Sequence, residues 1–301
     1  MLSRPAQLLL AFATVYLVWG STYLAIRVGV QALPAVLFAG LRFDIAGALM
    51  LAFALARGLK LPRSGSDWRN IAVTALLMLV GGNGLVTWSE QWVESNQAAL
   101  ISATSALWMA WMGARGAAGE KIQPLTLAGL LLGFAGVAVL VGGGMQLRAA
   151  PVPAYLALLA APLLWAAGSI YSRRHPLACA PLMTAALQMC VTGVLQTTLG
   201  LMLGESARWH YDSMAYLALA YLVVFGSCLA YGAYFWLVHQ VSPAALGTYA
   251  YVNPAVAVVL GWWLLDEHLS AMQISGTAVI LLGVILVTLA ARNSARKGNS
   301  H

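Results

Sequence analysis

The sequence predicts an all-α membrane protein whose ten transmembrane helices form two inverted five-helix repeats. Of the 301 residues, 61% are hydrophobic and only 8% are charged, so too few charged side chains exist to cover a water-facing surface. Apolar runs of about 20 residues, the length that crosses a bilayer, fill nearly the whole chain. Sheets are excluded because the backbone must satisfy its own polar groups in lipid, and these runs lack the alternation of barrel strands.

The apolar runs place the helices in order, separated by short connections that leave no room for an extramembrane domain. The first run follows a single basic residue, but it is too long for a signal peptide and has no small-residue cleavage site, so we expect it to be retained. The expected spans are 7–26, 36–56, 71–92, 96–115, 124–143, 154–172, 181–203, 214–237, 244–264 and 272–291.

A repeated pattern divides the chain into residues 1–148, with the first five helices, and residues 149–301, with the other five and a short basic tail. The matched positions, 146 or 147 residues apart, are Trp19 with Trp165, Ala98 with Ala244, Glu120 with Glu267, Gly129 with Gly276 and Gly136 with Gly283. Because five is odd, the second copy enters the membrane from the opposite side. The glycines favour close packing of spans 124–143 and 272–291, which we expect to line no pathway.

The basic residues indicate the orientation. Twelve lie on the side of the N-terminus, namely Arg4, Arg57, Lys60, Arg63, Arg69, Arg115, Lys121, Arg173, Arg174, Arg292, Arg296 and Lys297. Only Arg27, Arg148 and Arg208 lie on the other side. This bias predicts that both termini are cytoplasmic, and it explains the net charge of +7 without a nucleic-acid partner. Cys179, Cys190 and Cys228 have no metal-binding spacing, so we expect neither a metal nor a disulfide.

Polar stripes on spans 71–92 and 214–237 are the first candidates for a binding site. Asn83 and Thr87 share one helix face, with Trp88 on its flank. At the matching place in the second half, Ser227, Tyr231 and Tyr234 repeat the spacing i, i+4, i+7 of Asn83, Thr87 and Glu90. These side chains either line a pathway or form hydrogen bonds that hold the bundle together, and a tyrosine near a membrane end is often an interfacial anchor.

Spans 96–115 and 244–264 offer a second pair of candidates. Tyr249 and Asn253 precede Pro254, a predicted hinge whose missing amide proton frees a carbonyl one turn earlier. The alternative is a purely structural kink. In span 96–115, Ser105 and Trp108 lie on different faces, and the pattern does not decide which face points inward.

Spans 7–26 and 154–172 carry a third group. Trp19 and Tyr23 in the first span correspond to Trp165 and Ser169 in the second. Both tryptophans lie far from the ends of their spans, which argues against a simple interfacial belt. They are candidates for an aromatic wall of the site, with lipid-facing packing as the alternative.

Three charged residues are candidates for coupling or gating. Arg42 either extends to the headgroups or faces inward and holds a carboxylate or a helix C-terminus. Asp44 is two positions away, on nearly the opposite face, and is the deepest acid in the chain. Glu90 is the other plausible proton carrier, although either acid could instead be paired with a neighbouring helix.

The scarcity of buried charge limits the substrate. A polyanion would need several compensating cations, and a multivalent cation would need paired acids. Aromatic rings, hydroxyls and amides suit neutral or zwitterionic solutes with an apolar side chain, such as amino acids.

The chain resembles the EamA-type branch of the drug/metabolite transporter superfamily. The similar parts are WGSTY in the first span, Arg42 in LRFDIAG, and the long run from Ser242 to Val287, whose specific part extends from Pro254 to Gly283. The resemblance implies a ten-helix carrier of small metabolites, often exported and often amino acids, and points to the aromatic amino-acid exporters (YddG-like proteins). Trp108 stands where the first half would match Pro254, so a proline bend is not expected there.

We therefore expect a secondary transporter in the bacterial inner membrane that exports small neutral or zwitterionic metabolites, above all amino acids including aromatic ones, by alternating access. Its expected partners are a small-molecule substrate and the lipid bilayer, without a cofactor, and the chain would act as a monomer or homodimer. Proton-coupled efflux of drugs or toxic cations is the main alternative, since it would use Glu90 or Asp44. A lipid-modifying enzyme is disfavoured because no catalytic motif such as HExxH or GxSxG occurs.

Overall fold

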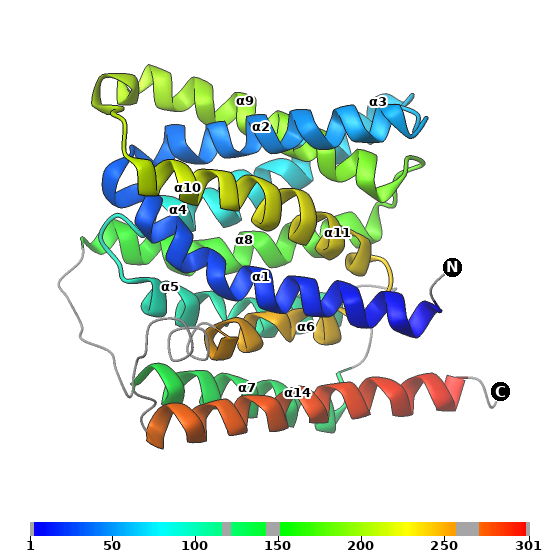
Figure 1. Ribbon diagram of the computed structural model, residues 1–301. Helices are drawn as coiled ribbons and strands as arrows, with labels where there is room; N and C mark the ends of the chain where they lie inside the picture. The colour runs from blue at the N-terminus through cyan, green and yellow to red at the C-terminus, as the bar shows by residue number, and fades with distance from the viewer. Residues whose placement is uncertain (1–2, 116–121, 143–150, 257–270, 299–301) are drawn as a thin grey trace.

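The structure is a computed structural model that describes residues 3–115, 122–142, 151–256 and 271–298. Within these residues every regular element is a helix, and the longest helices lie side by side along one direction (Figure 1). The two ends of the chain lie at the same end of this bundle. Glu120, Lys121, Arg148, Glu267 and the second part of the expected span 244–264 lie outside the described residues.

The first five crossings follow the expected order. The first two and the fifth are single helices, α1 (Arg4–Ala32), α2 (Ala35–Ala56) and α7 (Pro124–Gly142). The third is built from α3 (Gly65–Thr74), the π-helix η1 (Ala75–Asn83) and α4 (Gly84–Ser89). The fourth is built from α5 (Ser95–Ser102) and α6 (Ser105–Gly113).

The next five crossings repeat this arrangement. The sixth and seventh are α8 (Val152–Arg174) and α9 (Pro181–Met202), followed by the short 3₁₀ turn η2 (Glu205–Arg208). The eighth consists of α10 (Ser213–Tyr221), the π-helix η3 (Leu222–Tyr231) and α11 (Gly232–Val238). The ninth begins with α12 (Pro243–Gly247) and continues as helix over 249–256, and the tenth is α14 (Ala271–Gly298). In Figure 1, α8 runs opposite to α1.

Local sequence explains where several helices begin. The side chains of Ser64, Asp212 and Ser242 each accept a hydrogen bond from a backbone N–H three residues later, which satisfies one free donor of α3, α10 and α12. Pro181 and Pro243 occupy the first positions of α9 and α12, where the missing amide hydrogen costs nothing.

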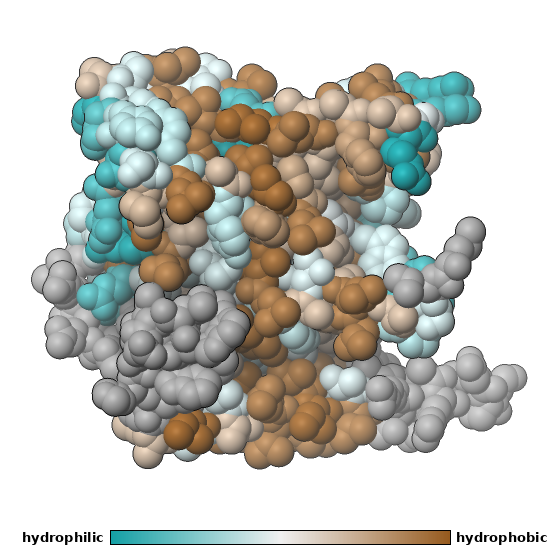
Figure 2. All heavy atoms as spheres, in the orientation of Figure 1, coloured by the Kyte–Doolittle hydropathy of each residue, from teal (hydrophilic) through white to brown (hydrophobic). Residues whose placement is uncertain are grey.

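The outer surface is that of a membrane protein. Among the described residues, six crossings, including α1, α2, α8 and α9, are by themselves long and apolar enough to span a bilayer. Figure 2 shows hydrophobic side chains over the middle of the visible face, with hydrophilic residues gathered toward its two ends. Leu17, Leu49, Leu156 and Leu229 are among the large side chains that point outward and are more than half exposed. Lipid tails are the natural partners of such a surface.

Two close helix pairs frame the bundle: α2 lies along α9, and α7 lies along α14. Glycines allow the second approach, since a Cβ placed on Gly283 would lie 2.7 Å from the carbonyl oxygen of Gly129 and 2.6 Å from the amide nitrogen of Gly133. The expected close packing of spans 124–143 and 272–291 is therefore present.

The irregular elements lie at matching places in the two halves. The π-helices η1 and η3 begin 147 residues apart, at Ala75 and Leu222. The fourth crossing is interrupted at Ala103 and Thr104, and the ninth is interrupted at Thr248. The first interruption contains no proline. It begins five residues before Trp108, the position that matches Pro254 of the second half. The second comes before Pro254, which lies inside the helical stretch 249–256.

Candidate functional site

The two tryptophans that the internal repeat pairs with each other meet at the centre of the molecule. Trp19 of α1 and Trp165 of α8 are packed edge to face, with ring centres 5.4 Å apart. Tyr234 of α11 and Tyr249 lie 5.0 and 5.2 Å from Trp19 and 5.4 Å from each other. Such contacts stabilise an aromatic cluster beyond the area that it buries.

Hydrogen bonds fix the position of Tyr234 within this cluster. Its hydroxyl accepts a bond of 2.9 Å from Trp165 Nε1 and lies 2.8 Å from Ser169 Oγ, while Ser169 donates to the carbonyl of Trp165. Tyr234 is completely buried and does not line the cavity described next. It therefore positions the Trp165 ring, as does Ser169.

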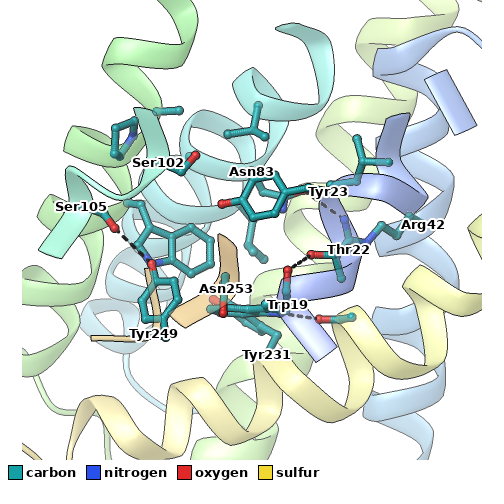
Figure 3. Close-up of a pocket in the computed structure, with 18 of the residues that line it drawn as sticks. Trp19, Thr22, Tyr23, Arg42, Asn83, Ser102, Ser105, Tyr231, Tyr249 and Asn253 are labelled. Atoms are coloured by element: carbon teal, nitrogen blue, oxygen red, sulfur yellow. Dashed lines mark hydrogen bonds between the residues drawn. The ribbon is translucent and has the colours of Figure 1, made fainter. Parts of the chain in front are cut away.

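A cavity lies beside the aromatic cluster, and its lining residues come from α1, α2, η1, α4, α5, α6, α8, η3 and the helical stretch 249–256 (Figure 3). The volume of this cavity that is open to the centre of a water molecule is about 80 Å³. This is several times the volume that one water needs. Nine of the residues predicted from the sequence line it: Trp19, Tyr23, Arg42, Asn83, Ser105, Trp165, Tyr231, Tyr249 and Asn253. No described residue of α7 or α14 does so.

Arg42 provides the positive charge of this cavity. Its side chain is 3% exposed, so it does not extend to the headgroups. Nε donates to Ser227 Oγ at 2.8 Å, and Nη1 donates to Asn83 Oδ1 at 3.3 Å. The guanidinium also lies 4.9 Å from the ring centre of Phe43. These contacts hold it at the cavity wall, as Figure 3 shows.

Some residues of the predicted stripes on the third and eighth crossings line the cavity, and others hold the lining residues in place. Thr87 is buried and donates a hydrogen bond of 3.0 Å to the carbonyl of Asn83, so it holds the segment that carries Asn83. Tyr231 lines the cavity, and its hydroxyl donates to Gln188 Oε1 at 2.6 Å. Gln188 in turn donates to Thr74 Oγ1, which joins α9 to the third crossing. Trp88 packs against Trp92 instead, at 4.8 Å.

The fourth and ninth crossings meet through hydroxyl groups. Ser105 Oγ lies 3.5 Å from the hydroxyl of Tyr249. The face with Ser102 and Ser105 points into the cavity, whereas Trp108 packs against Trp111 away from it. Pro254 is buried but does not line the cavity.

Neither predicted acid lines the cavity. Asp44 accepts a hydrogen bond of 2.5 Å from Thr197 Oγ1, in the contact between α2 and α9. Glu90 is fully buried after α4, and Arg27 donates to its backbone carbonyl. Neither carboxylate oxygen of Glu90 has a hydrogen-bond partner among the described residues. The lining of the cavity thus contains one cation and no carboxylate.

Three of the lining residues that were not predicted are informative. Thr22 and Ser102 are small hydroxyl residues on faces that the sequence left unassigned. Pro162 lies inside α8, one turn before Trp165. A proline within an apolar span was a signal for an irregular, pathway-lining position that sequence reasoning did not use.

Comparison with known proteins adds independent findings. The model of the EamA-like transporter family matches residues 7–142 and again residues 152–289. The uncharacterized inner membrane transporter YedA of Escherichia coli K12 is 40% identical over 280 residues, which are 93% of this chain and 90% of the relative. A probable amino-acid metabolite efflux pump of Salmonella typhimurium is 26% identical, with 90% and 91% covered. One crystal structure aligns with a TM-score of 0.81 and 27% identity, covering 97% of this chain and 99% of the other.

Proposed function

The chain belongs to the EamA-like transporter family, and from this premise we propose that it exports amino acids, including aromatic ones, by alternating access. Membership makes it a membrane transporter of small molecules and not an enzyme. The finer statement about substrate and direction is supported by the chemistry of the cavity and by the name of the relative in Salmonella typhimurium.

The observation that carries this proposal is the lining of the cavity. Trp19, Trp165 and Tyr249 provide flat apolar surfaces, while Asn83 and Ser105 add amide and hydroxyl groups. Pockets of this kind bind small solutes through apolar area and orient them with a few polar groups. A solute with one apolar side chain and a small polar end fits such a lining.

We place the protein in the bacterial inner membrane with both termini in the cytoplasm. The inner-membrane location follows the relative YedA, and the cytoplasmic termini follow the distribution of basic residues. Residues 1–148 and 149–301 are proposed to be inverted repeats that move against each other around the Trp19–Trp165 contact. A monomer or homodimer would suffice, because the cavity lies within one chain.

A counterflow assay tests this proposal. The purified full-length chain is reconstituted in liposomes loaded with unlabelled phenylalanine, and uptake of labelled phenylalanine is measured, with and without a pH gradient. We expect accumulation above that of empty liposomes, and competition by a panel of amino acids that is strongest for the aromatic ones. Accumulation driven by toxic organic cations but by no amino acid would instead establish the alternative of drug efflux.

A further inference from the structure

The cavity contains a buried guanidinium that no acid in the described part of the chain neutralises. Arg42 uses two of its five N–H donors on Ser227 and Asn83. Throughout the described parts of the chain, no carboxylate forms an ion pair with Arg42. Removing a charge from water without a counter-ion is costly, so a buried cation of this kind favours an anionic ligand.

Arg42 is also directed toward the space that a ligand would occupy. The residue belongs to the lining of the cavity, and Figure 3 shows its side chain extending toward Tyr23 and Thr22 at the cavity wall. Its Nε and Nη1 are held by the third and eighth crossings, so the position of the planar group is fixed. A guanidinium held in this way can bind a carboxylate through two parallel hydrogen bonds.

An unused acceptor lies elsewhere in the same cavity. Asn253 is 2% exposed, and its Oδ1 has no hydrogen-bond partner among the described residues. In Figure 3 Asn253 lies next to Trp19. A cavity lined by Asn253, Trp19 and Tyr249 is a suitable environment for an ammonium group, because aromatic rings also attract cations.

From this arrangement we infer that Arg42 binds the carboxylate of the substrate, and that Asn253 and the aromatic cluster accept its ammonium group and side chain. The substrate class is thus a zwitterionic monocarboxylate with an apolar side chain. This inference rests on the proposed function and sharpens it. A solute that carries only a positive charge would lie near the positive charge of Arg42, and the cavity lining offers no carboxylate to bind it.

Substrate analogues test the inference in the unmodified protein. Labelled phenylalanine counterflow is competed with 3-phenylpropionate, which lacks the amine, and with phenylalaninamide and phenethylamine, which lack the carboxylate. We expect 3-phenylpropionate to retain competition and both carboxylate-free compounds to be weaker than phenylalanine by about tenfold or more, the usual effect of losing a charge-assisted hydrogen bond. Equal competition by phenylalaninamide and phenylalanine would overturn the inference while leaving amino-acid transport intact.

Variants of Arg42 provide the second test. Arg42→Gln should raise the half-saturation concentration for phenylalanine by about tenfold or more, and Arg42→Lys should recover part of this loss, because a charge without the planar fork remains. The matched control is Arg57→Gln, which removes an exposed arginine at the other end of α2. The ratio of phenylalanine to phenethylamine competition, taken within each variant, is independent of the amount of folded protein.

The outcomes of the two tests are distinct. The inference is supported if the ratio of phenylalanine to phenethylamine competition falls toward one in Arg42→Gln and stays unchanged in Arg57→Gln. An unchanged ratio in Arg42→Gln overturns it, although phenylalanine flux would still uphold the proposed function. Flux of phenethylamine without any flux of phenylalanine would overturn both.

Discussion

At the scale of single residues, Trp19 is the side chain on which the cavity most depends. It touches Trp165, Tyr234 and Tyr249, and its Nε1 donates a hydrogen bond of 3.1 Å to the carbonyl of Gly226 in η3. It therefore joins elements of both halves while presenting an aromatic surface to the cavity.

Trp19→Leu should weaken transport of aromatic substrates selectively. Each aromatic contact contributes about 0.5–1.5 kcal/mol, so losing the indole face should raise the half-saturation concentration for phenylalanine by roughly tenfold and that for leucine by less. Counterflow with both amino acids measures this. Trp68→Leu is the matched control, since Trp68 is 42% exposed and lies outside the cavity. An equal loss for phenylalanine and leucine would contradict a direct role of the ring.

We predict that Glu90 carries a proton during transport. Its buried carboxylate has no donor among the described residues, and the groups that face it are Arg27, which bonds its backbone carbonyl, and Tyr23. A charged carboxylate in this environment is unfavourable, so a proton would bind when the site closes and leave when water enters.

Glu90→Gln should therefore keep phenylalanine exchange but lose any acceleration by a pH gradient. Counterflow at equal and unequal pH on the two sides measures the effect. Asp44→Asn serves as the control, because Asp44 is engaged with Thr197 between α2 and α9. If Glu90→Gln responds to the gradient as the unmodified protein does, Glu90 is not the coupling residue.

Sequence reasoning located most of the polar and aromatic residues that line the cavity, because such side chains are rare in lipid-spanning segments. It could not distinguish residues that line the cavity from residues that hold the lining in place, as Tyr234 and Ser169 illustrate. Both lie on predicted stripes, yet they bond to each other and hold Trp165. Which face of a helix points inward depends on packing against distant segments, so the choice between Ser105 and Trp108 also required the structure.

At the scale of elements, the irregular helices are the features that a periodicity of 3.6 residues could not reveal. The π-helices η1 and η3 carry Asn83, Gly226 and Tyr231 into the cavity wall. Such widened turns occur mostly where a protein has a functional reason for them. The break at Ala103 and Thr104 needs no proline, so the absence of one in this crossing was a poor guide to its shape.

The contact between α7 and α14 leads to a prediction about stability. In Gly283→Ala, the new methyl group would meet the backbone of Gly129 and Gly133, which cannot move aside as a side chain can. We expect a loss of about 1–3 kcal/mol in stability, the usual cost of overpacking, seen as a lower Tm in detergent. The half-saturation concentration for substrate should not change, because no described residue of either helix lines the cavity.

Gly65→Ala is the control for this change, since nothing lies within 4 Å of a Cβ at that position. Equal Tm values for the two variants would show that the close glycine contact does not stabilise the pair.

At the scale of the whole molecule, the predicted inversion has a consequence for topology. A reporter joined to the C-terminus should lie in the cytoplasm, and one joined after residue 148 should lie on the opposite side, because five crossings separate the two positions. Fusions to green fluorescent protein and to alkaline phosphatase measure this. The same reporter active at both positions would contradict two halves of five crossings each.

The central claim is that the cavity is the substrate site and opens to both sides of the membrane in turn. Ser102, which lines the cavity, is replaced by cysteine in a chain whose Cys179, Cys190 and Cys228 are changed to serine. Labelling by a membrane-impermeant maleimide, applied separately to each face of oriented vesicles, is the most direct measurement. We predict labelling from both faces, slowed by phenylalanine. Labelling from only one face, or none, in a chain that still exchanges phenylalanine would contradict the account.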